Sequence, residues 1–105
     1  MGLNPLTSEE RSRAVSKATA ARARRAEAKS ALKAGTLGLD ELFERATADE
    51  ALARLKVTEM LESFHGIGPV RSLAILGQLG IAPSRRLRGL GIHQRRALID
   101  FLEAQ

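Results

Sequence analysis

The segment Leu61-Glu-Ser-Phe64-His-Gly66-Ile-Gly68-Pro-Val-Arg71-Ser72-Leu-Ala-Ile75-Leu76 decides the fold that this sequence predicts. Two glycines flank one apolar residue, and glycine permits the positive φ angles and the close backbone approach that a tight hairpin uses. Pro69 directly follows Gly68, and proline favours the first position of a helix. The segment therefore predicts two helices joined by a short hairpin, with Ile67 inserted into the core.

The start of the second helix is a candidate anion site. Unpaired backbone N–H groups and the helix macrodipole suit a DNA phosphate there, and Arg71 can add a charge-assisted hydrogen bond. The spacing resembles the helix-hairpin-helix motif, apolar-x-x-apolar-x-Gly-apolar-Gly with a small residue four positions later, where Ser72 replaces the usual alanine. The resemblance implies binding to the DNA backbone. A tight interhelical turn without a ligand is the structural alternative.

The remainder of the chain predicts an all-α fold, because no segment alternates apolar and polar residues as a strand does. Thr47 is expected to cap a short helix that carries Leu52 and Leu55, and Thr58 a second that carries Met60, Leu61 and Phe64. Gly80 is expected to end the helix that runs to Leu79. The apolar residues expected in the core of this helical body are Leu39, Leu42, Phe43, Ala46, Leu52, Leu55, Met60, Leu61, Phe64, Leu98, Phe101 and Leu102.

Charge and hydrophobicity divide the chain into a basic N-terminal helical arm, residues 1–35, and a helical DNA-binding body, residues 36–105. The net charge is +5 over 1–35, −4 over 36–65 and +4 over 66–105. The Thr7–Glu10 stretch is a capping box, and no Gly or Pro follows before Gly35, so one helix about 40 Å long is predicted. Only five of the 29 Leu, Ile, Val, Met and Phe residues lie in the arm. The N-terminal half of this helix is therefore predicted to fray without DNA.

One side of the arm helix is cationic. At 100° per residue, five basic side chains fall on one stripe, and the last four are candidate DNA contacts: Arg11, Arg22, Arg25, Lys29 and Lys33. The alternative is an ordinary solvated face. A compositional bias is also open, since 13 of the 17 basic residues are Arg, as a GC-rich genome could produce.

A second basic element follows Pro83. Arg85, Arg86 and Arg88 surround Leu87, which is expected to be buried, so the three guanidinium groups are predicted to project outward from a turn beside the hairpin. Their planar groups suit phosphate or a minor groove. Arg95 and Arg96 are expected to be surface charges of the last helix.

Composition excludes several classes of function. A net charge of +5 and a pI near 10.7 favour a polyanionic partner, and only three aromatic residues favour duplex over single-stranded nucleic acid. With no cysteine and two separated histidines, neither a metal nor a cofactor is expected.

No membrane-spanning run is present and the start lacks a signal segment, so a cytoplasmic protein is predicted. His65 and His93 are expected to be turn residues, and no Asp, Glu or Lys lies in 63–99 to serve a glycosylase-like enzyme.

The chain from 7 to 102 resembles the actinobacterial integration host factor family. The likeness rests on Leu55-Lys-Val57, on Gly66-Ile-Gly-Pro-Val-Arg71, and on Ile81-Ala-Pro-Ser-Arg-Arg-Leu-Arg-Gly-Leu-Gly91 followed by Gln94-Arg. It implies a monomer that binds duplex DNA with weak sequence preference and acts in nucleoid compaction and phage integration. Carried over, it implies DNA contacts by Gly66, Gly68, Val70, Arg71, Ser84, Arg85, Arg86 and Arg88. Pro69 belongs to the same hairpin site but stands where relatives often carry a basic residue.

Two further classes stay open at this point. Ribosomal helix-two-turn-helix proteins share a similar glycine-rich phosphate grip, so an RNA-binding or ribosome-associated protein is the alternative function. A helical protein-interaction module is the other. The sequence favours a nucleoid-associated, non-enzymatic protein that binds double-stranded DNA largely without regard to its sequence.

Overall fold

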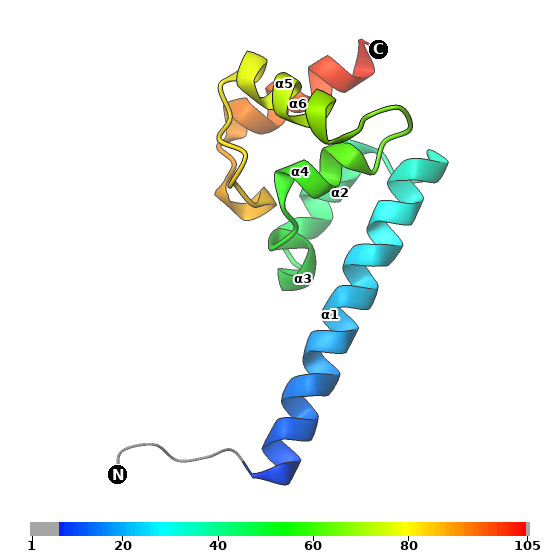
Figure 1. Cartoon of the computed structure of the whole chain (residues 1–105), viewed down its shortest axis with the longest axis vertical. Coiled ribbons are helices and arrows are strands. Elements are labelled where there is room, and N and C mark those ends of the chain that lie inside the picture. The colour runs from blue at the N-terminus through cyan, green and yellow to red at the C-terminus, as the bar shows by residue number, and fades with distance from the viewer. Residues whose placement is uncertain (1–6, 105) are drawn as a thin grey trace.

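A computed structural model describes residues 7–104. This part of the chain is all-α, as predicted, and contains no β-strand apart from one isolated bridge between Lys56 and Arg86. A long helix extends from a compact bundle of short helices (Figure 1). The elements are α1 Ser8–Ala34, α2 Leu39–Ala46, α3 Glu50–Ala53, α4 Val57–Glu62, α5 Pro69–Leu79, the 3-10 turn η1 Leu87–Gly89, and α6 Ile92–Glu103. The sequence interpretation that the start carries no signal segment concerns residues 1–6, which lie outside the described residues.

The two ends of α1 are set by local interactions. The Glu10 N–H donates to the Thr7 hydroxyl at 3.1 Å, and the Thr7 N–H donates to the Glu10 carboxylate at 3.2 Å, so the predicted capping box is confirmed. Gly35 ends the helix in the left-handed region, with φ of 78°, which glycine adopts without strain. The 27 residues between them correspond to a rod of about 40 Å.

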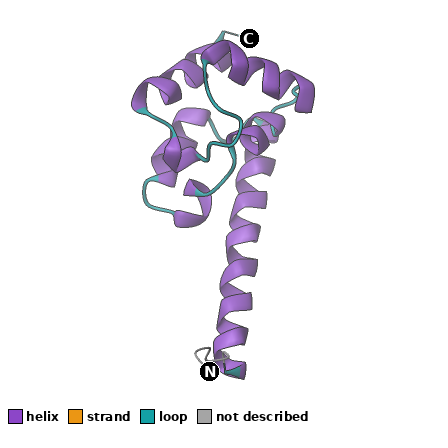
Figure 2. Cartoon of the chain, turned by 60° about the vertical axis from the view of Figure 1, so that its left-hand side comes forward, coloured by secondary structure: helices purple, strands orange, loops and turns teal. Residues whose placement is uncertain are grey.

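Only the C-terminal part of α1 is packed against the body. Ala28 and Leu32 are buried, whereas every residue from 7 to 20 is exposed. Figure 2 shows the resulting shape, with the N-terminal half of α1 projecting away from the other helices. The contact through Ala28 and Leu32 fixes the direction of α1, and so decides which of its side chains face the body.

The core lies among α2, α3, α4, α5 and α6. Most of the predicted core residues are buried, and Leu42, Leu55 and Leu98 are completely inaccessible. Ser72 is also completely buried, which explains why this position of the motif takes a small residue. Ala46, Phe64, Phe101 and Leu102 are partly buried against this cluster.

Two predicted helix caps are wrong. Thr47 ends α2, and its hydroxyl donates to the Glu44 carbonyl at 2.7 Å; α3 is instead capped by Asp49, whose carboxylate accepts from the Ala51 N–H at 2.9 Å. Thr58 lies inside α4, which begins at Val57. The start of α4 is set by a tertiary contact, because the Val57 N–H donates to the Arg85 carbonyl at 2.9 Å.

Helix ends and turns differ from the sequence interpretation at three other residues. Leu55 follows α3 and Phe64 follows α4, so neither lies in the short helix predicted for it. His93 lies in the first turn of α6 and not in a turn between helices, because Gly91 already serves as the N-cap. His65 does lie in a turn, as predicted.

Candidate nucleic-acid interface

The hairpin between α4 and α5 has the predicted geometry at Gly66. This residue has a φ of 84°, and the following Ile67 is 8% exposed and packed in the core. Gly68 was also expected to benefit from positive φ, and that is wrong: it is the extended N-cap of α5, with φ of −93°. Pro69 occupies the first position of α5, as predicted.

The start of α5 presents backbone to its surroundings. No side chain in the described part of the chain caps α5, and a Cβ atom built on Gly68 would meet nothing within 4 Å. An oxygen atom of a ligand can therefore approach the start of α5 at Gly68 without meeting a capping side chain. The macrodipole of an 11-residue helix favours a negative charge at this end.

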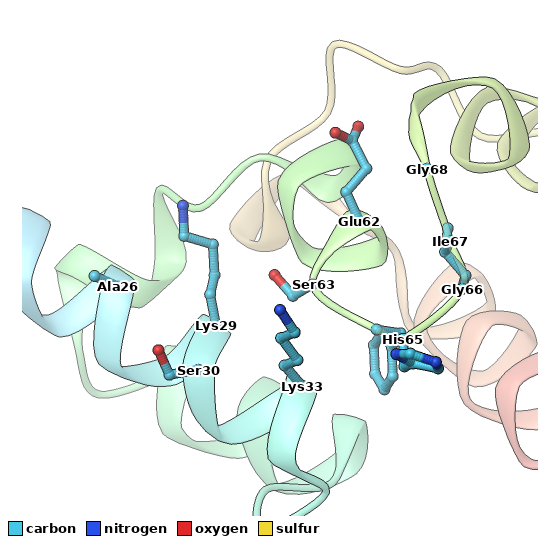
Figure 3. A pocket seen from close by; sticks show the side chains of 11 residues that line it. Ala26, Lys29, Ser30, Lys33, Glu62, Ser63, His65, Gly66, Ile67 and Gly68 are labelled. Atoms are coloured by element: carbon cyan, nitrogen blue, oxygen red, sulfur yellow. The ribbon is translucent and has the colours of Figure 1, made fainter.

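Two lysines of α1 face this hairpin. Lys29 and Lys33 line a cavity of about 490 Å³ together with Ser63, His65, the hairpin backbone of Gly66 to Gly68 and one carboxylate, that of Glu62. Figure 3 shows the two lysine side chains extending from α1 into the space between the helix and the hairpin turn. Two features that the sequence placed about 35 residues apart thus form one surface.

A larger groove of about 930 Å³ separates α1 from the turn that contains η1. Its charged lining is strongly basic: it consists of Arg22, Arg25, Lys29, Arg54, Lys56, Arg86 and Arg88, with Glu59 as the one acidic residue. Lys29 lines both this groove and the hairpin cavity. The two are therefore parts of one continuous surface, which we call the basic groove.

Backbone hydrogen bonds hold the turn of residues 84–89 in this position; we call this segment the arginine turn. The Leu87 N–H donates to the Leu55 carbonyl at 2.9 Å, next to the bond from Val57 to Arg85. Leu87 itself is 2% exposed, which confirms its predicted burial. The Arg86 guanidinium adds a bond of 2.7 Å to the Arg54 carbonyl.

Most of the seven cations that line the larger groove carry no compensating carboxylate. Arg54 is paired with Glu50 at 2.8 Å, and Arg25 donates only to the neutral Ala51 carbonyl at 3.4 Å. No ion pair within residues 7–104 involves the other five: Arg22, Lys29, Lys56, Arg86 and Arg88. Six positive charges thus remain to be neutralised by a partner.

Some sequence-predicted contacts lie outside the basic groove. Ser84 and Arg85 are exposed but do not line it, and the Arg85 guanidinium donates to the Gly89 carbonyl at 2.8 Å. Arg71 lines a smaller cavity beside Lys33. Val70 is 83% exposed at the start of α5. The arginine turn was expected beside the hairpin, but its residues Arg86 and Arg88 line the groove opposite residues 18–29 of α1.

Arg54 and Lys56 are groove residues that the sequence interpretation missed. They fall in the acidic stretch 36–65, whose net charge hides them. The four residues Arg54-Leu55-Lys56-Val57, too short a run to predict a strand, were the available signal, because their apolar members are buried and their two cations are exposed.

No group of three or more His, Cys, Asp or Glu within 7–104 could hold a metal ion. In the same range, no helix is long and apolar enough to cross a membrane.

Known proteins resemble this chain over most of its length. The family model of the S13-like H2TH domain matches residues 32–101. The integration host factor of Mycobacterium tuberculosis is 46% identical over 100 residues, 95% of each chain, and that of Streptomyces coelicolor is 44% identical over 98 residues, 93% of this chain and 92% of the relative. A solved structure described as sIHF bound to an 8bp palindromic DNA has a TM-score of 0.77 and 42% identity, covering 79% of this chain and 93% of that one. The chain therefore belongs to the integration host factor family of these actinobacteria, with an S13-like H2TH domain at residues 32–101.

Proposed function

We propose that this protein is a non-enzymatic architectural protein that binds double-stranded DNA through the sugar-phosphate backbone, with little dependence on sequence. The observation that carries the proposal is the basic groove, in which six uncompensated cations adjoin the uncapped start of α5. The family relationship supports it, since relatives are named integration host factor and a similar solved structure is described as bound to DNA.

The two parts of the interface have different roles in this mechanism. The hairpin offers fixed backbone donors at Gly68 and beyond, so it sets the position and direction of one phosphate. The arginine turn and α1 supply long cationic side chains, which contribute most of the affinity through release of counterions. Cations and backbone donors pair with phosphate oxygens and not with base edges, so affinity varies little between sequences.

The candidate contacts are those that the sequence singled out, together with Arg54 and Lys56. In the hairpin they are Gly66, Gly68, Pro69, Val70 and Arg71; in the arginine turn Ser84, Arg85, Arg86 and Arg88; and in α1 Arg22, Arg25, Lys29 and Lys33. Those that line the basic groove are expected to dominate the affinity.

The remaining parts of the proposal follow from this mechanism. The interface belongs to a single chain, so the protein is proposed to bind as a monomer and to reside with the nucleoid DNA. No substrate turnover is proposed. The carboxylates of the basic groove are Glu59 and Glu62, and the Ser63 hydroxyl beside them donates to the Glu59 backbone carbonyl at 2.7 Å and to no base.

A salt titration tests the proposal. Six neutralised phosphates predict that log affinity falls with log salt at a slope of about 5, by the rule of 0.9 per phosphate. The assay uses two unrelated DNA duplexes and one RNA duplex of equal length. Similar slopes and affinities on both DNA duplexes, with weaker binding to RNA, are expected. Tighter binding to RNA at equal salt would favour the ribosome-type alternative, and binding that does not depend on salt would refute the backbone mechanism.

A further inference from the structure

A separate cavity of about 490 Å³ borders the arginine turn on the side of α2 and α6. Its apolar lining includes Phe43, Ala53 and Leu87, and its charged side chains are Glu50, Arg88 and Arg95. Arg88 also lines the basic groove, and is the one residue common to the linings of these two spaces.

Arg95 was expected to be a surface charge, and that is wrong: it is half-buried and lines this cavity. Its Nε atom is buried and has no hydrogen-bond partner among the described residues. The backbone of Arg95 is fixed in the first turn of α6, where its N–H donates to the Gly91 carbonyl at 3.0 Å. Buried donors without an acceptor are unfavourable and uncommon, so a rotation of the Arg95 side chain that brings this Nε to a bound acceptor would be favoured.

The charges of the cavity favour an anion. The Glu50 carboxylate is engaged by Arg54 at 2.8 Å, whereas Arg88 and Arg95 have no carboxylate partner within residues 7–104. Two guanidinium groups therefore line the same apolar space without a counter-charge. Planar guanidinium groups bind carboxylate and phosphate oxygens with paired hydrogen bonds.

The surroundings select a small ligand over a polyanion. The adjoining helix α2 pairs Glu41 with Arg45 but carries Asp40 and Glu44 without an ion pair within residues 7–104, and these two carboxylates disfavour a second DNA duplex on this side of the molecule. A cavity of this volume with an apolar floor is within the range of small-molecule sites.

We propose that this cavity binds a small organic anion, a carboxylate or phosphate monoester joined to an apolar group, with its anionic end between Arg88 and Arg95. A bound anion draws Arg88 toward the cavity and away from the basic groove, so it weakens DNA binding. This coupling rests on the proposed function, whereas the site itself does not.

Binding is tested by NMR on the full chain, with benzoate and phenyl phosphate as probes and inorganic phosphate and benzyl alcohol as controls. We expect saturable shifts of the Arg95 Nε–H signal with both probes, at least fivefold weaker binding of inorganic phosphate, and none of benzyl alcohol. R95Q should abolish the shifts of the residues lining the cavity. R96Q is the matched control, because Arg96 is the neighbouring residue of α6 and is paired outside the cavity with Asp100 at 3.2 Å.

The outcomes separate the site from the coupling. No saturable shift at Arg95, or equal loss of binding in R96Q and R95Q, would overturn the site. If R95Q does not fold, R95K keeps the charge but loses the paired geometry, and wild-type affinity for phenyl phosphate in R95K would overturn the site as well.

Saturating benzoate, against sodium chloride at equal ionic strength, should lower DNA affinity about fivefold in the wild type and not in R95Q. An unchanged DNA affinity would overturn the coupling alone, whereas absence of DNA binding without any probe would instead contradict the proposed function.

Discussion

Replacing Lys29 by Gln removes a positive charge at the place where the hairpin cavity and the groove beside the arginine turn meet. No carboxylate within the described residues pairs with Lys29, so its charge is available to a phosphate. Gln and Lys have similar helix propensities, and Lys29 lies in the interior of α1. The substitution is therefore expected to change the charge of the interface and to leave the helix intact.

The size of the effect follows from the counterion rule. One fewer phosphate contact should reduce the slope of log affinity against log salt concentration from about 5 to about 4. One phosphate contact makes the binding constant at 0.1 M salt about 0.9 log units higher relative to its value at 1 M. Loss of that contact should therefore weaken the DNA affinity at 0.1 M salt about eightfold, or by about 1.2 kcal/mol. At 1 M salt the two proteins should bind almost equally weakly.

The assay is fluorescence anisotropy with a labelled duplex at five or more salt concentrations, with circular dichroism as a check of helix content. K17Q is the matched control, because Lys17 lies on the same helix, is exposed, and lines neither part of the basic groove. K17Q should bind as the wild type does. A K29Q slope that equals the wild-type slope, or an equal loss of affinity in K17Q, would refute the assignment of the groove.

Three other predictions concern the hairpin, the arginine turn and the free state of α1. Gly66→Ala should destabilise the fold by about 1–2 kcal/mol in chemical denaturation, since φ is 84°. Gly68→Ala should cost less stability, that of a poorer N-cap alone, but should bind DNA more weakly; equal stability losses would contradict this reading of the hairpin. Arg88→Ala should reduce DNA affinity more than Arg85→Ala, because Arg88 lines the groove and Arg85 is bonded to a carbonyl; a titration that ranks them in the opposite order would be inconsistent with the geometry. Amide exchange in free protein should be faster over residues 8–20 than at the buried end of α1, and DNA should slow it; strong protection without DNA would disprove the expected fraying.

The features that the sequence predicted correctly depend on interactions over a few residues. The capping box at Thr7 and Glu10, the stop at Gly35 and the turn at Gly66 each need a particular residue type at a fixed spacing, so they can be recognised without knowing the fold. The all-α class follows similarly, from helical spacing of apolar residues.

The caps at Thr47 and Thr58 were mispredicted because several residues could satisfy the same local rule. Asp49 can cap α3 as well as Thr47 can, and nothing within the segment itself distinguishes them. The start of α4 depends on the Arg85 carbonyl, 28 positions further along the chain from Val57. No local pattern carries that information.

The sequence by itself determined that two basic elements and a glycine-containing hairpin between two helices exist. Only the tertiary structure decided that they form one surface, because the direction of α1 depends on the burial of Ala28 and Leu32 against the body. The bonds from Leu87 to Leu55 and from Arg86 to Arg54 likewise join segments about 30 residues apart, and they bring Lys56 into the groove. Contacts between distant segments depend on how the whole core packs, whereas residue type and spacing along the chain report only on neighbours.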